Sequence, residues 1–206
     1  EKVGLVLKTG LSKGSLLDKN KTKEALEQIL EEHKERKCKI YLIHGNLEEQ
    51  ELHALYHHPK IKAYLSATHG EGYGLPIFEA AYSGLPVIAT DWSGHLDFLT
   101  VQDQKTEKKK KLFARIEHDL KEIQQEAQWA HILVKDSKWA YPRKLSFRKQ
   151  IRQMYKNYGM YKKWAEKLKI HTLEKYSFEN VTGMMADAIF GSAKPEESYD
   201  DSVMIL

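Results

Sequence analysis

Short β-rich segments alternate strictly with helix-like segments over the first ninety residues of the chain. This alternation predicts strands at 3–8, 39–44, 61–66 and 86–90, and helices at 22–37, 48–56 and 75–83. A helix between two strands carries the chain from one parallel strand to the next, so repeated strand–helix–strand units predict an α/β fold with a mostly parallel, doubly wound sheet. In such folds, ligands bind beyond the carboxyl ends of the strands.

Composition excludes several classes of protein. With 41% hydrophobic residues, the 206-residue chain can bury a core, which excludes disorder of the whole chain. Cys38 is the only cysteine, so an internal disulfide framework is excluded and a reducing, cytoplasmic environment is expected. The net charge of +4 is too small to indicate nucleic-acid binding by itself. Because the chain starts at Glu1 rather than at a methionine, we expect it to be a fragment of a longer protein.

The alternation weakens after Leu99, and the second half is predicted to be mainly helical. The charged run 105–111 is typical of a solvated loop, and 112–116 has the pattern of an edge strand. Helices are expected from Lys144 to about Phe190, with breaks near Gly159 and near 176–177. Ser177 is the expected N-cap of the last helix, and the acidic tail 192–206 is expected to be disordered.

The turn between the third strand and the helix at Leu75 contains three alternating glycines, Gly70, Gly72 and Gly74. Glycines let backbone amides approach a ligand closely, and a helix N-terminus offers free N–H groups and the positive end of its dipole. This combination predicts an anion site suited to a phosphate. Glu71 in the loop and Glu79 in the second helical turn can face the same crevice, where two carboxylates can hold sugar or ribose hydroxyls.

The run HGEGYGLPIFEAAYSGLPVIATDWSGHLDFL, from His69 to Leu99, resembles the signature of retaining GT-B glycosyltransferases of group 1, the family-4-like type, with their Glu-x7-Glu motif. Residues 46–56 resemble the family's segment between the second and third strands, and 177–181 resemble its C-terminal helix. The resemblance implies a Rossmann-like C-terminal half that binds a nucleotide sugar. It also implies a missing N-terminal domain that binds the acceptor.

The resemblance assigns roles to individual residues. Glu71 would contact the donor sugar and act as the catalytic residue, and Glu79 would bind the ribose hydroxyls. The remaining expected donor-binding residues are Lys8, Lys13, Gly45, Asn46, His69, Gly70, Gly72, Tyr73, Gly74 and Leu75. Lys8 and Lys13 would take the places of an Arg and a Lys that family members commonly use, because the usual Gly-Arg pair is missing here; Lys19 and Lys21 are the competing alternatives. For His69, a side chain that stabilises the turn is an equal alternative.

The expected domain organisation has three parts: a donor-binding domain at 1–142, C-terminal helices packed on it at 143–191, and the tail at 192–206. The expected donor is a UDP-sugar or a GDP-sugar. No metal is expected, because the histidines form no His-Glu-x-x-His motif and no Asp-x-Asp sequence is present. Two alternatives remain: a non-catalytic nucleotide-sugar-binding module or scaffold, and a hydrolase or epimerase of activated sugars.

Residues 143–169 carry ten Lys or Arg against the single acid Glu166, a net charge of +9, with aromatic residues interleaved. The helical spacing of seven apolar or aromatic side chains predicts a packed stripe: Ile151, Met154, Tyr155, Tyr158, Tyr161, Trp164 and Leu168. Three interpretations of the cationic face stay open, in this order: solubility, attraction to an anionic membrane surface or a lipid-linked acceptor, and nucleic acid, which is the least favoured. A cytoplasmic protein peripheral to the inner face of a membrane fits the second.

Overall fold

A computed structural model describes residues 3–11, 14–103 and 107–191 of the chain. The chain forms two compact units, Glu1–Leu55 and Tyr56–Leu206. The division falls inside the segment 1–142 that the sequence groups as one domain. The tail expected to be disordered, 192–206, lies outside the described residues.

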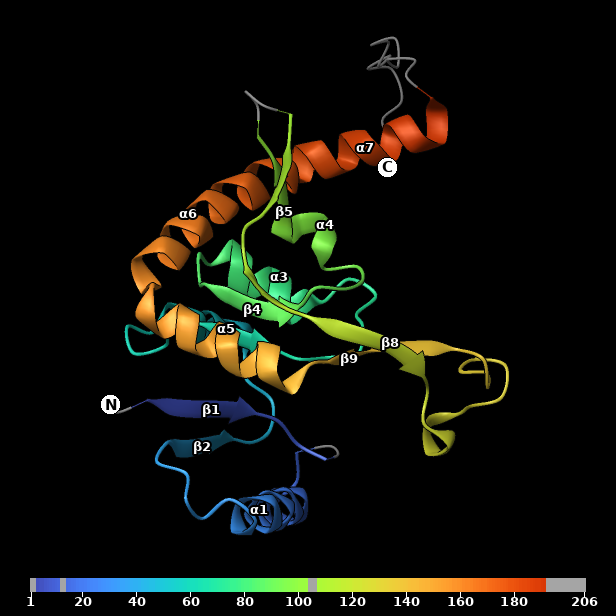
Figure 1. The fold of residues 1–206 in the computed structure, drawn as a ribbon. Helices are drawn as coiled ribbons and strands as arrows, with labels where there is room; N and C mark the ends of the chain where they lie inside the picture. Colours follow the sequence, from blue (N-terminus) through green and yellow to red (C-terminus); the bar gives the residue numbers. More distant parts are fainter. Residues whose placement is uncertain (1–2, 12–13, 104–106, 192–206) are drawn as a thin grey trace, which may run out of the picture. The chain divides into compact units, whose positions relative to one another are not determined.

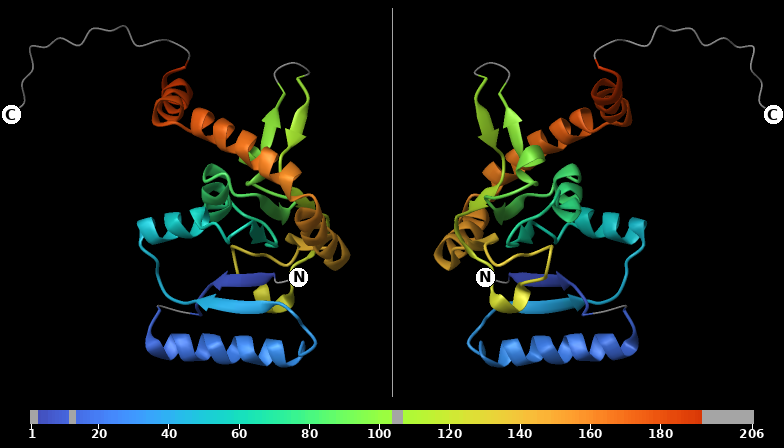
Figure 2. Two further views of the ribbon diagram at one scale, coloured as in Figure 1. Left: turned by 90° about the vertical axis from the view of Figure 1, so that its left-hand side faces the viewer. Right: turned by 90° about the vertical axis from the view of Figure 1, so that its right-hand side faces the viewer.

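The first unit contains a parallel pair of strands joined through a helix. Its elements are β1 (Gly4–Lys8), α1 (Leu16–Glu31) and β2 (Lys39–Ile43). Gly4 pairs with Lys39 and Lys8 with Ile43, so the carboxyl ends of both strands lie at the same edge. The helix α1 lies on one side of the strand pair (Figures 1 and 2). The predicted strand–helix–strand order and the parallel pairing are confirmed.

The predicted bounds of the first helix, 22–37, are wrong at both ends. The helix α1 begins at Leu16 because the Ser15 hydroxyl caps it, accepting a hydrogen bond from the Asp18 amide at 3.1 Å. It ends at Glu31, and Ile29, expected in its apolar stripe, is 58% exposed. The earlier start places the buried side chains of Asp18 and Thr22 on the inner face of the helix.

The second unit is built on a three-stranded parallel sheet in the order β3–β4–β7. The helix α2 (Glu49–His57) spans the division between the units. The sheet and its connections comprise β3 (Tyr64–Ser66), α3 (Leu75–Tyr82), β4 (Val87–Thr90), α4 (Leu96–Leu99) and β7 (Ala114–Ile116). The predicted edge strand at 112–116 is confirmed as β7, which lies at one end of the sheet order.

Both faces of this sheet are covered, as in other parallel sheets. All four residues of β4 are buried. Val87 and Ala89 belong to one hydrophobic cluster with residues of α3 and α6, whereas Ile88 belongs to a second cluster with residues of β7 and α5. Neighbouring residues of one strand therefore pack against helices on opposite sides, which confirms the predicted doubly wound, Rossmann-like α/β fold.

Two antiparallel hairpins extend the unit. In the first, β5 (Thr100–Gln102) pairs with β6 (Lys109–Lys111), so the prediction of a loop is wrong for these three lysines. The backbone of these lysines pairs with β5, and the charge of Lys111 is matched by Asp91, whose Oδ1 lies 2.5 Å from Lys111 Nζ. This hairpin projects from the end of the unit where α7 lies (Figures 1 and 2).

The second hairpin, β8 (His118–Glu122) with β9 (Lys138–Pro142), was not predicted. A short 3-10 helix (Gln125–Ala127) lies between its strands. Its first strand, β8, has the sequence HDLKE, which lacks the alternation of apolar and polar residues by which a strand is predicted. One end of the hairpin rejoins the core, because the Ala140 amide donates to the His69 carbonyl oxygen at 3.1 Å.

The C-terminal part folds into three helices, α5 (Lys144–Lys156), α6 (Tyr158–Lys175) and α7 (Phe178–Phe190). The first break lies at Asn157, two residues before the predicted glycine, and the second lies at 176–177 as predicted. The Ser177 cap is confirmed, since its hydroxyl accepts from the Asn180 amide at 3.2 Å.

The predicted apolar stripe is only partly correct. Met154, Tyr161 and Leu168 are buried, but Tyr155 is 52% exposed and Ile151 is 36% exposed. The break between α5 and α6 interrupts the helical period on which the stripe depends, so positions on α5 and α6 do not continue one face.

Candidate functional site

The turn between β3 and α3 is shaped by a glycine that no other residue could replace without strain. Gly74 caps α3 with φ 86° and ψ 57°, in the left-handed region. A Cβ at this buried position would lie 3.3 Å from Ile77 Cδ1 and 3.5 Å from Glu71 Cβ. The amides of Ile77 and Phe78 both donate to the Gly74 carbonyl oxygen at 2.9 Å. Leu75 is the first residue of α3, so helix geometry gives its amide no partner within the helix and leaves it available to a ligand; Pro76, the next residue, has no N–H to offer.

The backbone of Glu71 is held by the turn that follows β4. The Glu71 amide donates to Ser93 Oγ at 2.7 Å. The Glu71 carbonyl oxygen accepts from the Ser93 hydroxyl at 3.1 Å and from the Gly94 amide at 3.1 Å. Both polar groups of the Glu71 peptide unit are therefore fixed, and its half-buried side chain starts from an immobilised backbone.

This turn is itself under conformational constraint. Ser93 has φ 77°, an uncommon value for a residue with a side chain, and it sits where its hydroxyl can reach Glu71. Next to it, a Cβ on Gly94 would overlap the carbonyl oxygen of Gly72. The loop 70–74 and the turn 93–94 thus approach so closely that only glycine fits at one position.

Glu79 is held by a tyrosine from α2. The Tyr56 hydroxyl donates to Glu79 Oε2 at 3.1 Å, and its ring meets Tyr64 edge-on with centroids 6.2 Å apart. Burial and the charge of Glu79 raise the pKa of Tyr56 above its usual range, so its hydroxyl keeps the proton that it donates. Burial, followed by the charges of Glu71 and Glu79, raises the pKa of Tyr64. The charges of both carboxylates therefore contribute to the raised pKa of one phenol, that of Tyr64 in β3.

His69 is engaged with the second hairpin. Its Nδ1 lies 2.9 Å from the Ala140 carbonyl oxygen. Its ring stacks on Trp139 with centroids 4.9 Å apart at 10°, and also contacts Tyr141 at 4.6 Å. These contacts favour the turn-stabilising role among the two weighed for His69.

The remaining predicted residues of the turn differ in their surroundings. A Cβ at Gly70 would lie near Ser93 and Trp92, whereas one at Gly72 would meet nothing within 4 Å. Tyr73 is 37% exposed, and its ring packs against Phe78 and Phe98. Tyr73 therefore contributes to the core under the turn, and Gly72 is open.

Four predicted residues belong to the first unit. Lys8 is the exposed last residue of β1, and Lys13 lies outside the described residues. Gly45 follows β2 with φ 91°. It lies close to Gly14, because a Cβ on Gly14 would be 3.4 Å from the Gly45 Cα. Asn46 is exposed.

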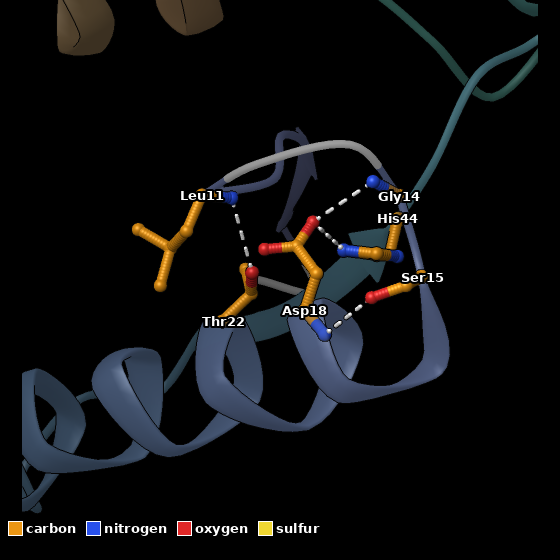
Figure 3. Close-up of polar contacts among 6 residues, drawn as sticks. All are labelled: Leu11, Gly14, Ser15, Asp18, Thr22 and His44. Carbon is orange, nitrogen blue, oxygen red and sulfur yellow. Dashed lines mark hydrogen bonds and ion pairs between the residues drawn. The ribbon is translucent and has the colours of Figure 1, made fainter.

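A buried acid–imidazole pair, not predicted, fastens the loop after β1 (Figure 3). Asp18 Oδ2 lies 2.9 Å from His44 Nε2 and accepts from the Gly14 amide at 3.1 Å. The two side chains are 4% and 5% exposed. A Cβ on Gly10 would lie 3.2 Å from the same carboxylate oxygen. The pair thus connects α1, the end of β2 and both ends of the loop 10–14.

Two of the missed features had signals in the sequence. Ser15 and Asp18 have the spacing of a helix-capping pair, which marks the true start of α1. Ser93-Gly94 is a turn dipeptide directly after a strand. The Tyr56–Glu79 contact had none, because it joins residues from different helices.

The parallel, helix-covered sheets define a Rossmann-like half-domain with a glycine turn at the carboxyl end of β3. Residues 8–130, more than half of the chain, match the family model of group 1 glycosyltransferases. The chain belongs to this family. No curated protein matches it. Within the described residues, no helix is long and apolar enough to cross a membrane.

We predict that Ser93→Ala lowers the free energy of unfolding by about 1–3 kcal/mol, because Glu71 loses partners for its amide and its carbonyl oxygen. Ser93→Gly removes the same hydroxyl but relieves the positive φ, so it should be more stable than Ser93→Ala by about 1 kcal/mol. Urea unfolding followed by tryptophan fluorescence tests this, since all four tryptophans lie after residue 91. If the wild type and both variants were equally stable, the Ser93 hydroxyl would not contribute to stability through its hydrogen bonds to the Glu71 backbone.

We predict that Asp18→Ala frees the Gly14 amide, which then exchanges with solvent about tenfold faster or more. The Leu11 amide, which donates to Thr22 Oγ1, is the internal reference and should keep its exchange rate. Hydrogen exchange by NMR measures both amides, with Lys19→Ala on the same helix as the matched control. Unchanged exchange at Gly14 would show that the pair does not hold the loop.

Proposed function

We propose that this chain is the nucleotide-sugar-binding half of a retaining GT-B glycosyltransferase. The observation that carries the proposal is the position of the two carboxylates around the start of α3: Glu71 lies in the glycine loop with its backbone held by Ser93, and Glu79 lies in the second turn of the helix that Gly74 opens. The family membership supports glycosyl transfer. The donor class and the stereochemical outcome are our inference, and we propose a UDP-sugar or a GDP-sugar as donor.

In the proposed mechanism, Glu71 contacts the donor sugar and Glu79 binds the ribose hydroxyls. The Gly74 and Leu75 amides face the diphosphate at the N-terminus of α3. As the glycosidic bond to the diphosphate breaks, negative charge develops on the leaving group, and fixed N–H groups stabilise it without reorganising. The Ser93–Gly94 turn serves this function by fixing the Glu71 backbone.

Lys8 and Lys13 are proposed to neutralise the diphosphate, and Gly45 and Asn46 to lie beside the base. Support comes from the carboxyl ends of β1 and β2, which lie at one edge as in nucleotide-binding α/β sheets. The pair Asp18–His44 then positions the loop that follows β1. His69, Gly70, Gly72 and Tyr73 complete the proposed donor-binding set, with His69 in a positioning role.

We propose that residues 1–142 act as the donor domain and that the helices 143–191 cover it. A separate N-terminal domain supplies the acceptor site, so this chain binds donor but transfers sugar poorly when alone. Transfer is proposed to need no metal, since no Asp-x-Asp sequence is present. A cytoplasmic location agrees with the single cysteine.

We predict that Glu79→Ala weakens nucleoside diphosphate binding by about 10- to 100-fold, because charged hydrogen bonds contribute about 1.5–3 kcal/mol. Thermal-shift titration with UDP and GDP first identifies the base that stabilises the wild type, and calorimetry then measures affinity. Glu79→Ala and the wild type should bind the 2′,3′-dideoxy analogue of that nucleotide with the same affinity, because the analogue has no ribose hydroxyls for Glu79 to bind.

Glu126→Ala is the matched control, since Glu126 is an exposed acid in the second unit. Unchanged affinity of Glu79→Ala for the ribonucleotide would overturn the role of Glu79. Stabilisation by neither nucleotide would count against donor binding by this chain.

A further inference from the structure

The outer face of α5 is strongly basic. The 13-residue helix carries five cations and no acid: Lys144, Arg148, Lys149, Arg152 and Lys156. Four of these, Arg148, Lys149, Arg152 and Lys156, line one shallow groove together with Leu145 and Gln153. We call these four cations and Leu145 the α5 basic face. Arg148, Lys149, Arg152 and Lys156 lie three, four, seven and eleven residues after Leu145, spacings that place all of them on the side of the helix where Leu145 lies.

The opposite side of α5 fixes this face in place. Met154 is buried in the hydrophobic cluster that includes Ile88 and Ile116, and Phe147 packs against the same cluster. The Ser146 hydroxyl accepts from the Glu117 amide at 2.9 Å. The helix therefore cannot rotate to hide its cations, and binding through the basic face needs no rearrangement of the helix backbone.

The cations of this face differ from others nearby in lacking acidic partners. Arg143 pairs with Asp119 at 2.5 Å, and Lys162 pairs with Glu166 at 2.7 Å. Across residues 3–11, 14–103 and 107–191, by contrast, no carboxylate lies within ion-pair distance of the four cations of the basic face. Like charges thus stand together on one rigid surface, an arrangement that an external polyanion would neutralise.

An exposed leucine lies within this basic face. Leu145 is 80% exposed, and it lies one helical turn from Arg148 and Lys149. Tyr155, on the same helix, is 52% exposed. An apolar side chain surrounded by long cationic ones is typical of surfaces that enter the boundary between lipid headgroups and acyl chains, where Lys and Arg reach the phosphates. The phosphate backbone of a nucleic acid offers no apolar region to such a leucine.

We propose that the α5 basic face binds an anionic phospholipid surface, with Leu145 inserted at the acyl boundary and the four cations on lipid phosphates. This inference does not depend on the proposed transferase activity. It makes the protein a peripheral membrane protein and places its second unit at a surface where lipid-linked substrates are found.

Sedimentation with vesicles tests the proposal on the 206-residue chain. The chain should bind vesicles containing about 30% phosphatidylserine, bind poorly to phosphatidylcholine alone, and dissociate as salt is raised. The double variant Arg148→Gln/Arg152→Gln should bind about 30-fold more weakly, at about fivefold for each cation. Leu145→Ser should bind about tenfold more weakly at every salt concentration.

The control Lys121→Gln/Lys135→Gln removes the same charge from exposed positions outside α5 and should bind like the wild type. Equal losses for both double variants would overturn the α5 site, as would no binding to anionic vesicles. If Leu145→Ser bound vesicles as well as the wild type, and the chain bound single-stranded RNA more tightly than vesicles, the proposal of a lipid partner would be overturned in favour of nucleic acid. Nucleotide-induced stabilisation, measured separately, reports on the donor site whatever the vesicle result.

Discussion

The close approach of two backbone turns is the constraint on which the rest of the site depends. The turn 93–94 touches the loop 70–74 so closely that Gly94 has no room for a Cβ, and Ser93 accepts an uncommon φ to bond both polar groups of Glu71. Such strain persists only where the surrounding structure imposes it. Here all of β4 is buried, as are Phe98 and Leu99 of α4, so the elements that flank the turn are anchored in the core.

In the same site, two partly buried acids, Glu71 and Glu79, are held by a constrained backbone and by a neighbouring tyrosine. Gly74 starts α3 in a left-handed conformation that brings its Cα beside Glu71, while Tyr56 reaches from α2 to hold Glu79. Carboxylates positioned in this way lose little conformational freedom when they bind hydroxyl groups. In the first unit, the buried pair Asp18–His44 fastens the loop after β1 in a comparable way. Each unit thus holds its loops with side-chain hydrogen bonds, which are buried in the Asp18–His44 pair and partly buried around Glu71 and Glu79.

Much of the fold could be predicted from periodicity, because residues 3–90 follow one repeated pattern. The parallel strands, α3 and the Ser177 cap were predicted correctly. The start of α1 was wrong because its capping serine lies in a polar segment with no apolar stripe. The hairpin β8–β9 was missed because its stability comes from pairing and from contacts with His69, not from the composition of its strands.

For the candidate site, local sequence placed Glu71 and the glycines in one loop and Glu79 in the helix that follows, but it did not reveal the residues that hold the two glutamates. Ser93 and Tyr56 lie 22 and 23 residues from the glutamates they contact. Asp18 lies 26 residues from His44. Contacts at such separations depend on how strands and helices pack, and a single sequence carries no signal for them.

The most direct test of the account is an NMR titration of the ¹⁵N-labelled chain with UDP and with GDP. If the glycine turn is a nucleotide-sugar site, one nucleotide should shift the amide resonances of Gly74 and Leu75 together with those of Glu71 and Glu79. Saturable shifts confined to residues elsewhere, with the turn unaffected, would contradict it.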